Sequence, residues 1–245
     1  MSNLFDVIAK DPVPDEPEFD DLPAGAWIVA KTADKERGGA APAVSDRSKQ
    51  DSPPNYQFRV GLICAGGDGL IKERAHKGQM VFLERWIHPS AEYERVDTPV
   101  SGAFMGFLNT VFSPGIGLGL EAEERKQARW SNTLAQLKQS ADEAGITNDV
   151  AIAADPDFTG TGELSLRGRG LAVAMAAVAA LGEDSKVLLC KTKTDNYVNK
   201  SGDKVSRTKA GTVEDFTGDN VTKRKVTVFD GEETPAEPKT PLATF

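Results

Sequence analysis

The chain has 245 residues, which is enough for one large domain or two small ones, and its net charge is −8. The acidity lies at the two ends: residues 1–21 carry a net charge of −6 and residues 230–245 a net charge of −3, which leaves +1 for residues 22–229. The composition therefore excludes a uniformly basic nucleic-acid-binding protein but leaves room for a locally basic surface.

Secretion and membrane signals are missing from the sequence pattern. Residues 1–10 lack the basic start and the long apolar stretch of a secretion signal. The most apolar run, Leu171–Leu181, is far shorter than the roughly 20 residues needed to span a bilayer. Cys64 and Cys190 lie in separate apolar runs and have no partners at metal-ligand spacing. We therefore expect a cytoplasmic protein with buried free thiols, no membrane contact, and neither a metal nor another cofactor.

The first hundred residues predict an acidic arm followed by an antiparallel meander. Residues 1–21 combine acidic charge with three prolines, so we expect a disordered arm. Residues 34–55 are rich in Gly, Pro, Ser and charged residues, which predicts a long polar loop. The strands expected in this part, with a Gly-rich turn over 66–69, cover residues 26–31, 56–64, 70–73 and 78–86.

The middle of the chain predicts helices, and the end returns to strands. Helical spacing of apolar residues covers 98–112, and Ser113-Pro114-Gly115 ends it. Residues 121–144 begin with acidic side chains and are followed by Gly145, as in a well-capped helix. We expect a short strand over 148–153, a buried helix over 170–181, and strands over 186–192, 208–216 and 221–229. This order predicts a single α+β domain over 22–229 with a helical insert at about 99–182, if both strand sets join one sheet.

The strongest charge contrast lies near the C-terminus. Residues 186–229 are strand-like and carry ten Lys or Arg against five Asp or Glu. The acidic tail, residues 230–245, follows and stops on Phe245. A basic β surface next to an acidic tail is typical of a protein that handles a polyanion, because the surface attracts phosphates and the tail competes for it or recruits other proteins.

Several segments together resemble a phage-type single-stranded-DNA-binding protein. Leu22-Pro23-Ala24-Gly25 leads into the first strand, and the long polar loop and strand 56–64 follow. The closing half consists of residues 186–192, the Lys-rich hairpin through Asn199-Lys200-Ser201-Gly202, residues 213–216, and the acidic tail.

This resemblance implies both a fold and a function. The fold is an OB-fold-like antiparallel β barrel with a helical insertion and disordered acidic termini. The function is binding of single-stranded DNA in replication or recombination, in the host cytoplasm if the chain is phage-encoded. Phe245 at the end of the tail is then the contact to replication or recombination proteins.

Binding a single strand without reading its sequence requires cations for the phosphates and aromatic faces for the bases. Tyr56 and Phe58 project to one face of their strand, and Phe82 and Trp86 share a face opposite to Arg85. We expect Phe58 and Phe82 in the core. The predicted DNA-binding residues are Tyr56, Arg59, Arg85, Trp86, Lys191, Lys193, Tyr197, Lys200, Lys204, Arg207 and Lys209.

Two alternative functions remain open at this point. Asp155-Pro156-Asp157 offers paired carboxylates for Mg²⁺, as in a metal-dependent nuclease, although the same residues are typical of a turn. The Pro-rich arms and long loops also suit a viral structural or assembly protein. The glycines of residues 115–119 lack the spacing of a dinucleotide-binding loop and predict a linker instead. We therefore predict a non-catalytic protein that binds single-stranded DNA, with these two alternatives behind it.

Overall fold

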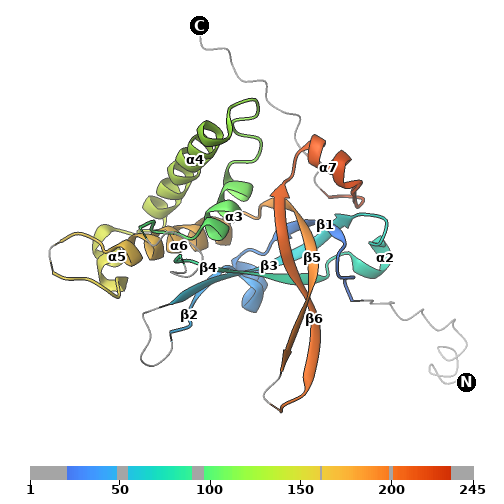
Figure 1. The fold of residues 1–245 in the computed structure, drawn as a ribbon, viewed down its shortest axis with the longest axis horizontal. Coiled ribbons are helices and arrows are strands. Elements are labelled where there is room, and N and C mark those ends of the chain that lie inside the picture. Colours follow the sequence, from blue (N-terminus) through green and yellow to red (C-terminus); the bar gives the residue numbers. More distant parts are fainter. Residues whose placement is uncertain (1–20, 49–54, 90–96, 161, 199–200, 233–245) are drawn as a thin grey trace, which may run out of the picture.

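The computed structural model describes residues 21–48, 55–89, 97–160, 162–198 and 201–232. Almost all of the predicted acidic arm, most of the predicted tail, Lys200 and Phe245 lie outside these residues. In the described part, seven strands form one antiparallel sheet, and several helices pack against it (Figure 1). The expected mixed α+β architecture with an antiparallel sheet is confirmed at this level.

The sheet joins strands from both ends of the chain. β3 pairs with β2 and β1 along one edge and with β4 and β7 along the other, and β1 continues the sheet by pairing with β5, which pairs with β6. The path β4-β3-β1-β5-β6 therefore brings the late hairpin beside the early meander. The strands are β1 (Trp27–Thr32), β2 (Ala43–Asp46), β3 (Tyr56–Gly67), β4 (Met80–Trp86), β5 (Val187–Val198), β6 (Lys204–Asp215) and β7 (Thr227–Val228).

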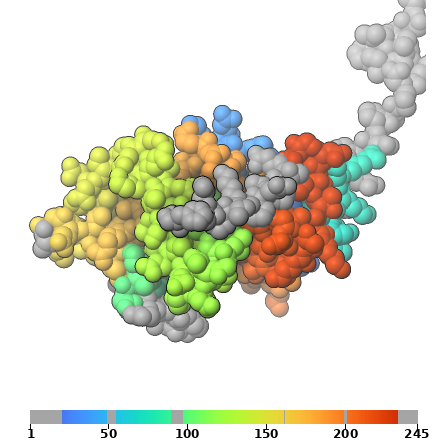
Figure 2. Space-filling model, turned by 90° about the horizontal axis from the view of Figure 1, so that it is seen from above, coloured from blue at the N-terminus to red at the C-terminus, as the bar shows by residue number. Residues whose placement is uncertain are grey.

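Helices connect β4 to β5, and smaller helices flank the strands. Figure 2 views the molecule from above the orientation of Figure 1 and shows α3 and α4 over one part of it and α7 over another. The helices are η1 (Lys35–Ala40), α2 (Glu73–His76), α3 (Gly102–Phe112), α4 (Ala122–Glu143), α5 (Asn148–Ala154), α6 (Leu166–Glu183) and α7 (Gly218–Arg224).

The main core lies between one face of the sheet and helices α3 and α6. Alternate residues of β3 supply Phe58, Val60 and Leu62, all fully buried. The ring of Phe58 meets those of Phe104 and Phe107 from α3 at centroid distances of 5.2 and 5.7 Å. Burial of a side chain of this size stabilises the fold by about 1.5–3 kcal/mol. The prediction that Phe58 belongs to the core is confirmed.

The opposite face of the sheet carries a much smaller core beneath α7. Val29, Ala65 and Leu189 from three neighbouring strands pack there with Val226. We call this side of the sheet the outer face, because α3 and α6 pack on the other side. Helix α7 covers part of the outer face. The part nearer β4 and the β5–β6 hairpin is uncovered and carries the candidate site described below.

Three predicted strands are wrong, and one predicted loop is structured. Residues 70–73 form a turn and the start of α2, and residues 148–153 form α5, which Thr147 caps by accepting from the Val150 amide. Most of 221–229 belongs to α7 and the two-residue strand β7, because Thr217 caps a helix there. The predicted loop 34–55 contains η1 and β2. For 148–153 and 221–229 a short apolar run suited either periodicity, and a capping threonine hydroxyl decided in favour of a helix.

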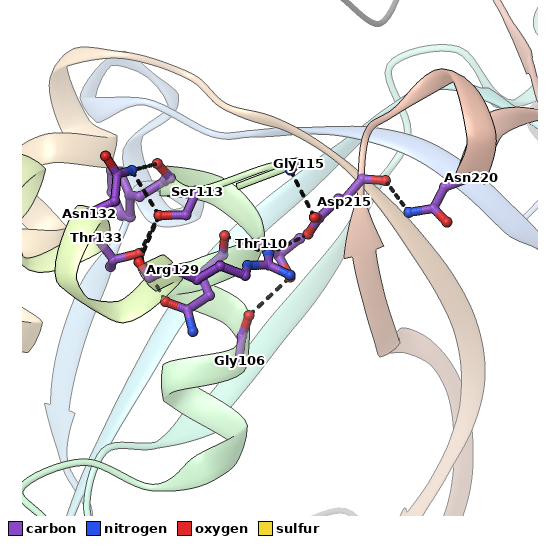
Figure 3. Close-up of polar contacts among 11 residues, drawn as sticks. Gly106, Thr110, Ser113, Gly115, Arg129, Asn132, Thr133, Asp215 and Asn220 are labelled. Atoms are coloured by element: carbon purple, nitrogen blue, oxygen red, sulfur yellow. Dashed lines mark hydrogen bonds and ion pairs between the residues drawn. The ribbon is translucent and has the colours of Figure 1, made fainter. Parts of the chain in front are cut away.

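A buried polar network fastens the helical insert to the end of β6 (Figure 3). Arg129 of α4 donates from Nη2 to Oδ1 of Asp215 at 2.6 Å and to the Asn109 carbonyl of α3 at 2.8 Å. The Gly115 amide donates to Oδ2 of Asp215 at 3.1 Å, and Asn220 of α7 donates to the Asp215 carbonyl at 3.0 Å. We call the ion pair at its centre the Arg129–Asp215 clasp. It fixes α3 and α4 relative to the hairpin strand.

Candidate nucleic-acid interface

Cationic and aromatic side chains meet on the open part of the outer face. The guanidinium carbon of Arg59 on β3 lies 3.5 Å from the ring centroid of Phe82 on β4. Strand alternation places Phe82, Glu84 and Trp86 on this same face, and Trp86 is 46% exposed. The expectation that Phe82 is a core residue is wrong, because its ring is only half-buried and stacks under a guanidinium.

The β5–β6 hairpin repeats this combination further along. The guanidinium of Arg207 lies 5.1 Å from the ring of Tyr197, which is 42% exposed. Arg207 also contacts Asp195 at 3.2 Å, and the Lys209 ammonium reaches the same carboxylate at 2.7 Å. Hydrogen bonding by Lys209, followed by that of Arg207, holds the pKa of Asp195 below its usual range.

One carboxylate joins the Arg59–Phe82 pair to the Arg207–Tyr197 pair, and we call this continuous arrangement the row. Glu84 on β4 lies 3.9 Å from Arg59 and 4.0 Å from Arg207. Next to it, Arg85 donates from Nη2 to the Gly211 carbonyl of β6 at 2.6 Å, so β4 and β6 approach each other there. These contacts bring together side chains that are more than a hundred residues apart in the chain.

Three of the lysines predicted for phosphate contact, Lys191, Lys193 and Lys204, are exposed. Lys191 and Lys193 lie on β5 and Lys204 at the start of β6, and none of them makes an ion pair within the described residues. The row of Arg59, Arg207 and Lys209 is in part neutralised by Glu84 and Asp195. The three lysines therefore supply most of the uncompensated positive charge near the hairpin.

Tyr56 has a different role from the other predicted residues. It is half-buried at the start of β3, packs against the main core, and meets His88 edge-on with ring centroids 5.8 Å apart. Burial is the main cause that raises the pKa of its hydroxyl. The structure thus places Tyr56 in packing contacts rather than in the row. Lys200 and Phe245 lie outside the described residues.

A further stacked pair was missed by the sequence reasoning. The guanidinium of Arg224 on α7 lies 4.3 Å from the ring of Trp27 on β1 and forms an ion pair with Glu214. This pair also lies on the outer face, because Trp27 packs with the small core there. It was missed because α7 was taken for a strand. The capping residue Thr217 ahead of a helix was the signal that could have revealed it.

The paired carboxylates of the nuclease alternative are engaged in local structure. Asp155 accepts from the Ser165 hydroxyl and amide, both at 2.6 Å, and so braces the start of α6. Asp157 forms an ion pair with Arg167 at 3.0 Å. Across the residues that the structure describes, no group of three or more His, Cys, Asp or Glu side chains is arranged to hold a metal ion. Cys64 and Cys190 are free and buried, as expected.

Comparisons with known proteins add no relative. No protein-family model, no curated protein and no solved structure matches the chain. Among the helices of the described ranges, none combines the length and the apolar character needed to cross a membrane.

Proposed function

We propose that this chain is a non-catalytic single-stranded-DNA-binding protein that acts in replication or recombination. The observation that carries the proposal is the row of stacked Arg–aromatic pairs on the outer face, Arg59 with Phe82 and Arg207 with Tyr197, beside exposed lysines. Guanidinium and ammonium groups bind phosphates, and exposed ring faces stack on bases whatever the sequence. Both requirements for binding a single strand therefore meet on one side of one sheet.

The strand connections support an OB-like fold for this function. In chain order the five long strands are β1, β3, β4, β5 and β6, and the first pairs with the second and the fourth. The second pairs with the third and the fourth with the fifth, while the third approaches the fifth through Arg85 and Gly211. This order supports the proposal of a five-stranded, partly open Greek-key barrel. In that fold the face of the second and third strands binds oligonucleotides, and here that face carries Arg59, Phe82 and Trp86.

Titration of a fluorescein-labelled dT oligonucleotide of about 20 nucleotides tests the proposal by fluorescence anisotropy. Binding is expected at low salt and should weaken with rising salt, with a slope of log K against log salt of about −0.7 for each phosphate contacted. If the anisotropy of the oligonucleotide does not change on addition of the protein at about 50 mM salt, the proposed function is refuted.

Single substitutions then locate the binding surface. Stacking contributes about 1–3 kcal/mol per base, so Trp86→Ala and Tyr197→Ala should each weaken binding by about 5- to 150-fold. Leu134→Ala is the control, because Leu134 is likewise 39% exposed but lies on α4, which packs against α3 and α6. Equal affinity of all three variants would show that the DNA strand binds outside the row.

The acidic tail is proposed to compete for the same surface. Glu232 forms an ion pair with Lys31 at 2.6 Å, and the Asp230 carbonyl accepts from Lys77. The two acidic residues at the start of the predicted tail are therefore anchored, and a truncation should begin at residue 233. Removal of residues 233–245 should tighten binding to dT, whereas unchanged affinity contradicts the competition.

The alternative of a structural or assembly protein has one observation in its favour. The loop between α3 and α4 exposes Ile116, Leu118 and Leu120 by 38%, 57% and 45%. Exposed apolar side chains in sequence are typical of a surface that another protein covers. Light scattering during size-exclusion chromatography, in the absence of DNA, tests this alternative: growth of assemblies with protein concentration favours it.

The non-catalytic part of the proposal depends on the engagement of Asp155 by Ser165 and of Asp157 by Arg167. Incubation of labelled single-stranded DNA with the protein and Mg²⁺ should leave the DNA intact. Cleavage that Asp157→Asn abolishes would favour the nuclease alternative.

A further inference from the structure

A cleft of about 950 Å³ lies between helix α3 and the base of the β5–β6 hairpin. Its volume is in the range of sites for small ligands. One wall is helical and the other belongs to the sheet, and α3 contacts both β5 and β6 beside it. The lining residues that the argument uses are Ala103, Gly106 and Thr110 on the helix and Arg85, Lys191 and Lys193 on the strands.

The helical wall is built from small residues. Ala103, Gly106 and Thr110 are spaced three and four apart and therefore share one face of α3. Glycine inside a helix is destabilising by roughly 0.5–1 kcal/mol relative to alanine, so a packing reason for it is expected. Gly168 and Gly170 of α6 have one, because a Cβ atom would lie 2.3 Å from Asp155 and 2.1 Å from a backbone carbonyl.

Gly106 has no such packing reason. A Cβ atom built there would meet no heavy atom within 4 Å, so the space beside it is open. The hydroxyl of Thr110 donates to the Gly106 carbonyl at 2.9 Å and is therefore directed along the helix (Figure 3). The wall thus offers a smooth surface that lets a ligand approach the helix backbone closely.

The strand wall is cationic. Arg85, Lys191 and Lys193 line the cleft, and none of its described lining residues is acidic. Arg85 is held in place because Nη1 donates to the Glu84 carbonyl and Nη2 to the Gly211 carbonyl. Its guanidinium carries further N–H donors besides these two. A bulge in β6 opposite Lys191 widens the ladder at this point.

We propose that this cleft binds the phosphate group of a nucleotide, with helix α3 as one wall. Cationic side chains on the other wall match a phosphate, and Phe107 and Val213 add apolar surface for a sugar or base. The nucleotide is either a unit of the single strand, in which case the inference rests on the proposed function, or a free nucleotide. The Arg129–Asp215 clasp keeps the two walls at a fixed separation, so the cleft is preformed.

Titrations of ¹⁵N-labelled protein with dTMP and with a dT oligonucleotide test the inference by NMR. The amide resonances of Gly25, Gly106 and Gly211 report on the cleft, since all three residues line it. Shifts of these resonances with either probe support the cleft as a phosphate site, and no shift with either probe overturns it. Shifts with dTMP in a protein that does not bind the oligonucleotide assign the cleft to free nucleotides and refute the proposed function alone.

Variants at Gly106 give the matched comparison. Gly106→Glu places a carboxylate in the open space and should weaken whichever probe binds by about tenfold or more, because like charges repel at close range. Ala135→Glu adds the same charge at an exposed position of α4, outside the cleft, so it should stay within about twofold of the unmodified protein. Lys191→Gln, an exposed substitution, serves as a second test if Gly106→Glu does not fold.

The cleft inference and the proposed function fail separately. If the oligonucleotide binds, the three glycine resonances do not move, and both Gly106→Glu and Lys191→Gln bind like the unmodified protein, then the cleft is refuted and the outer face stands.

Discussion

The Arg129–Asp215 clasp provides the sharpest test of how the helical insert is held. In Asp215→Asn, one carboxylate oxygen becomes an amide that donates hydrogen bonds. Both oxygens of Asp215 accept from donors, Oδ1 from Arg129 at 2.6 Å and Oδ2 from the Gly115 amide at 3.1 Å. The new NH₂ group must therefore face another donor, whichever way the amide is turned.

The expected loss follows from the burial and the partners. The two side chains are 20% and 13% exposed, so solvent screens the pair only in part. A hydrogen bond to a charged group contributes about 1.5–3 kcal/mol, and one donor is left opposed, so we expect the free energy of unfolding to fall by about 2–3 kcal/mol. For a domain of this size about 1 kcal/mol corresponds to about 2–4 °C, so the melting temperature should fall by about 4–12 °C.

Urea and thermal unfolding followed by circular dichroism measure this loss. Arg129→Met should cost a similar amount, and the double variant should cost less than the sum of the two, because both substitutions remove the same contact. Asp142→Asn is the matched control: it breaks the Lys138–Asp142 pair, whose side chains are 76% and 64% exposed, and should change stability by less than about 0.5 kcal/mol. If Asp215→Asn has the same melting temperature as Asp142→Asn, the clasp does not hold the helical insert.

Three further predictions concern buried groups. Gly170→Ala should destabilise the protein by about 1–3 kcal/mol, because its Cβ atom would lie 2.1 Å from a backbone carbonyl oxygen. Gly106→Ala, where the space is open, should stabilise the protein by up to about 1 kcal/mol. Urea unfolding measures both changes, and a change of the same sign for both would contradict the packing argument. Burial lowers the pKa of His88, so the unfolded chain binds the proton at a higher pH than the folded chain does, and stability should fall as the pH drops below about 6.5. In His88→Gln the melting temperature should depend less on pH between about pH 7 and pH 5. An unaltered pH dependence of the melting temperature would contradict this role of His88. Burial raises the pKa of Cys64 to about 11 and that of Cys190 to about 12, so a thiol reagent such as DTNB should react only after denaturation, and fast reaction with native protein would show that the thiols are accessible.

Much of the fold is readable from local pattern. The helix predicted over 121–144 is α4, and the expectation that Phe58 of the strand 56–64 belongs to the core is confirmed. These assignments succeed because a long periodic segment has only one way to bury its apolar face. The short segments 70–73, 148–153 and 221–229 failed because a few apolar residues suit a helix or a strand equally well.

The sequence alone determined which side chains were available for binding: a basic segment near the C-terminus with aromatic residues among the cations, and acidic ends that mask it in the overall charge. Only the tertiary structure decided which of them meet. Arg59 and Arg207 are joined through Glu84, Tyr56 turns toward His88, and the small face of α3 meets Arg85 across a cleft. Strand pairing across more than a hundred residues sets these contacts, and such pairing depends on the register of the whole sheet, which no local stretch of sequence specifies.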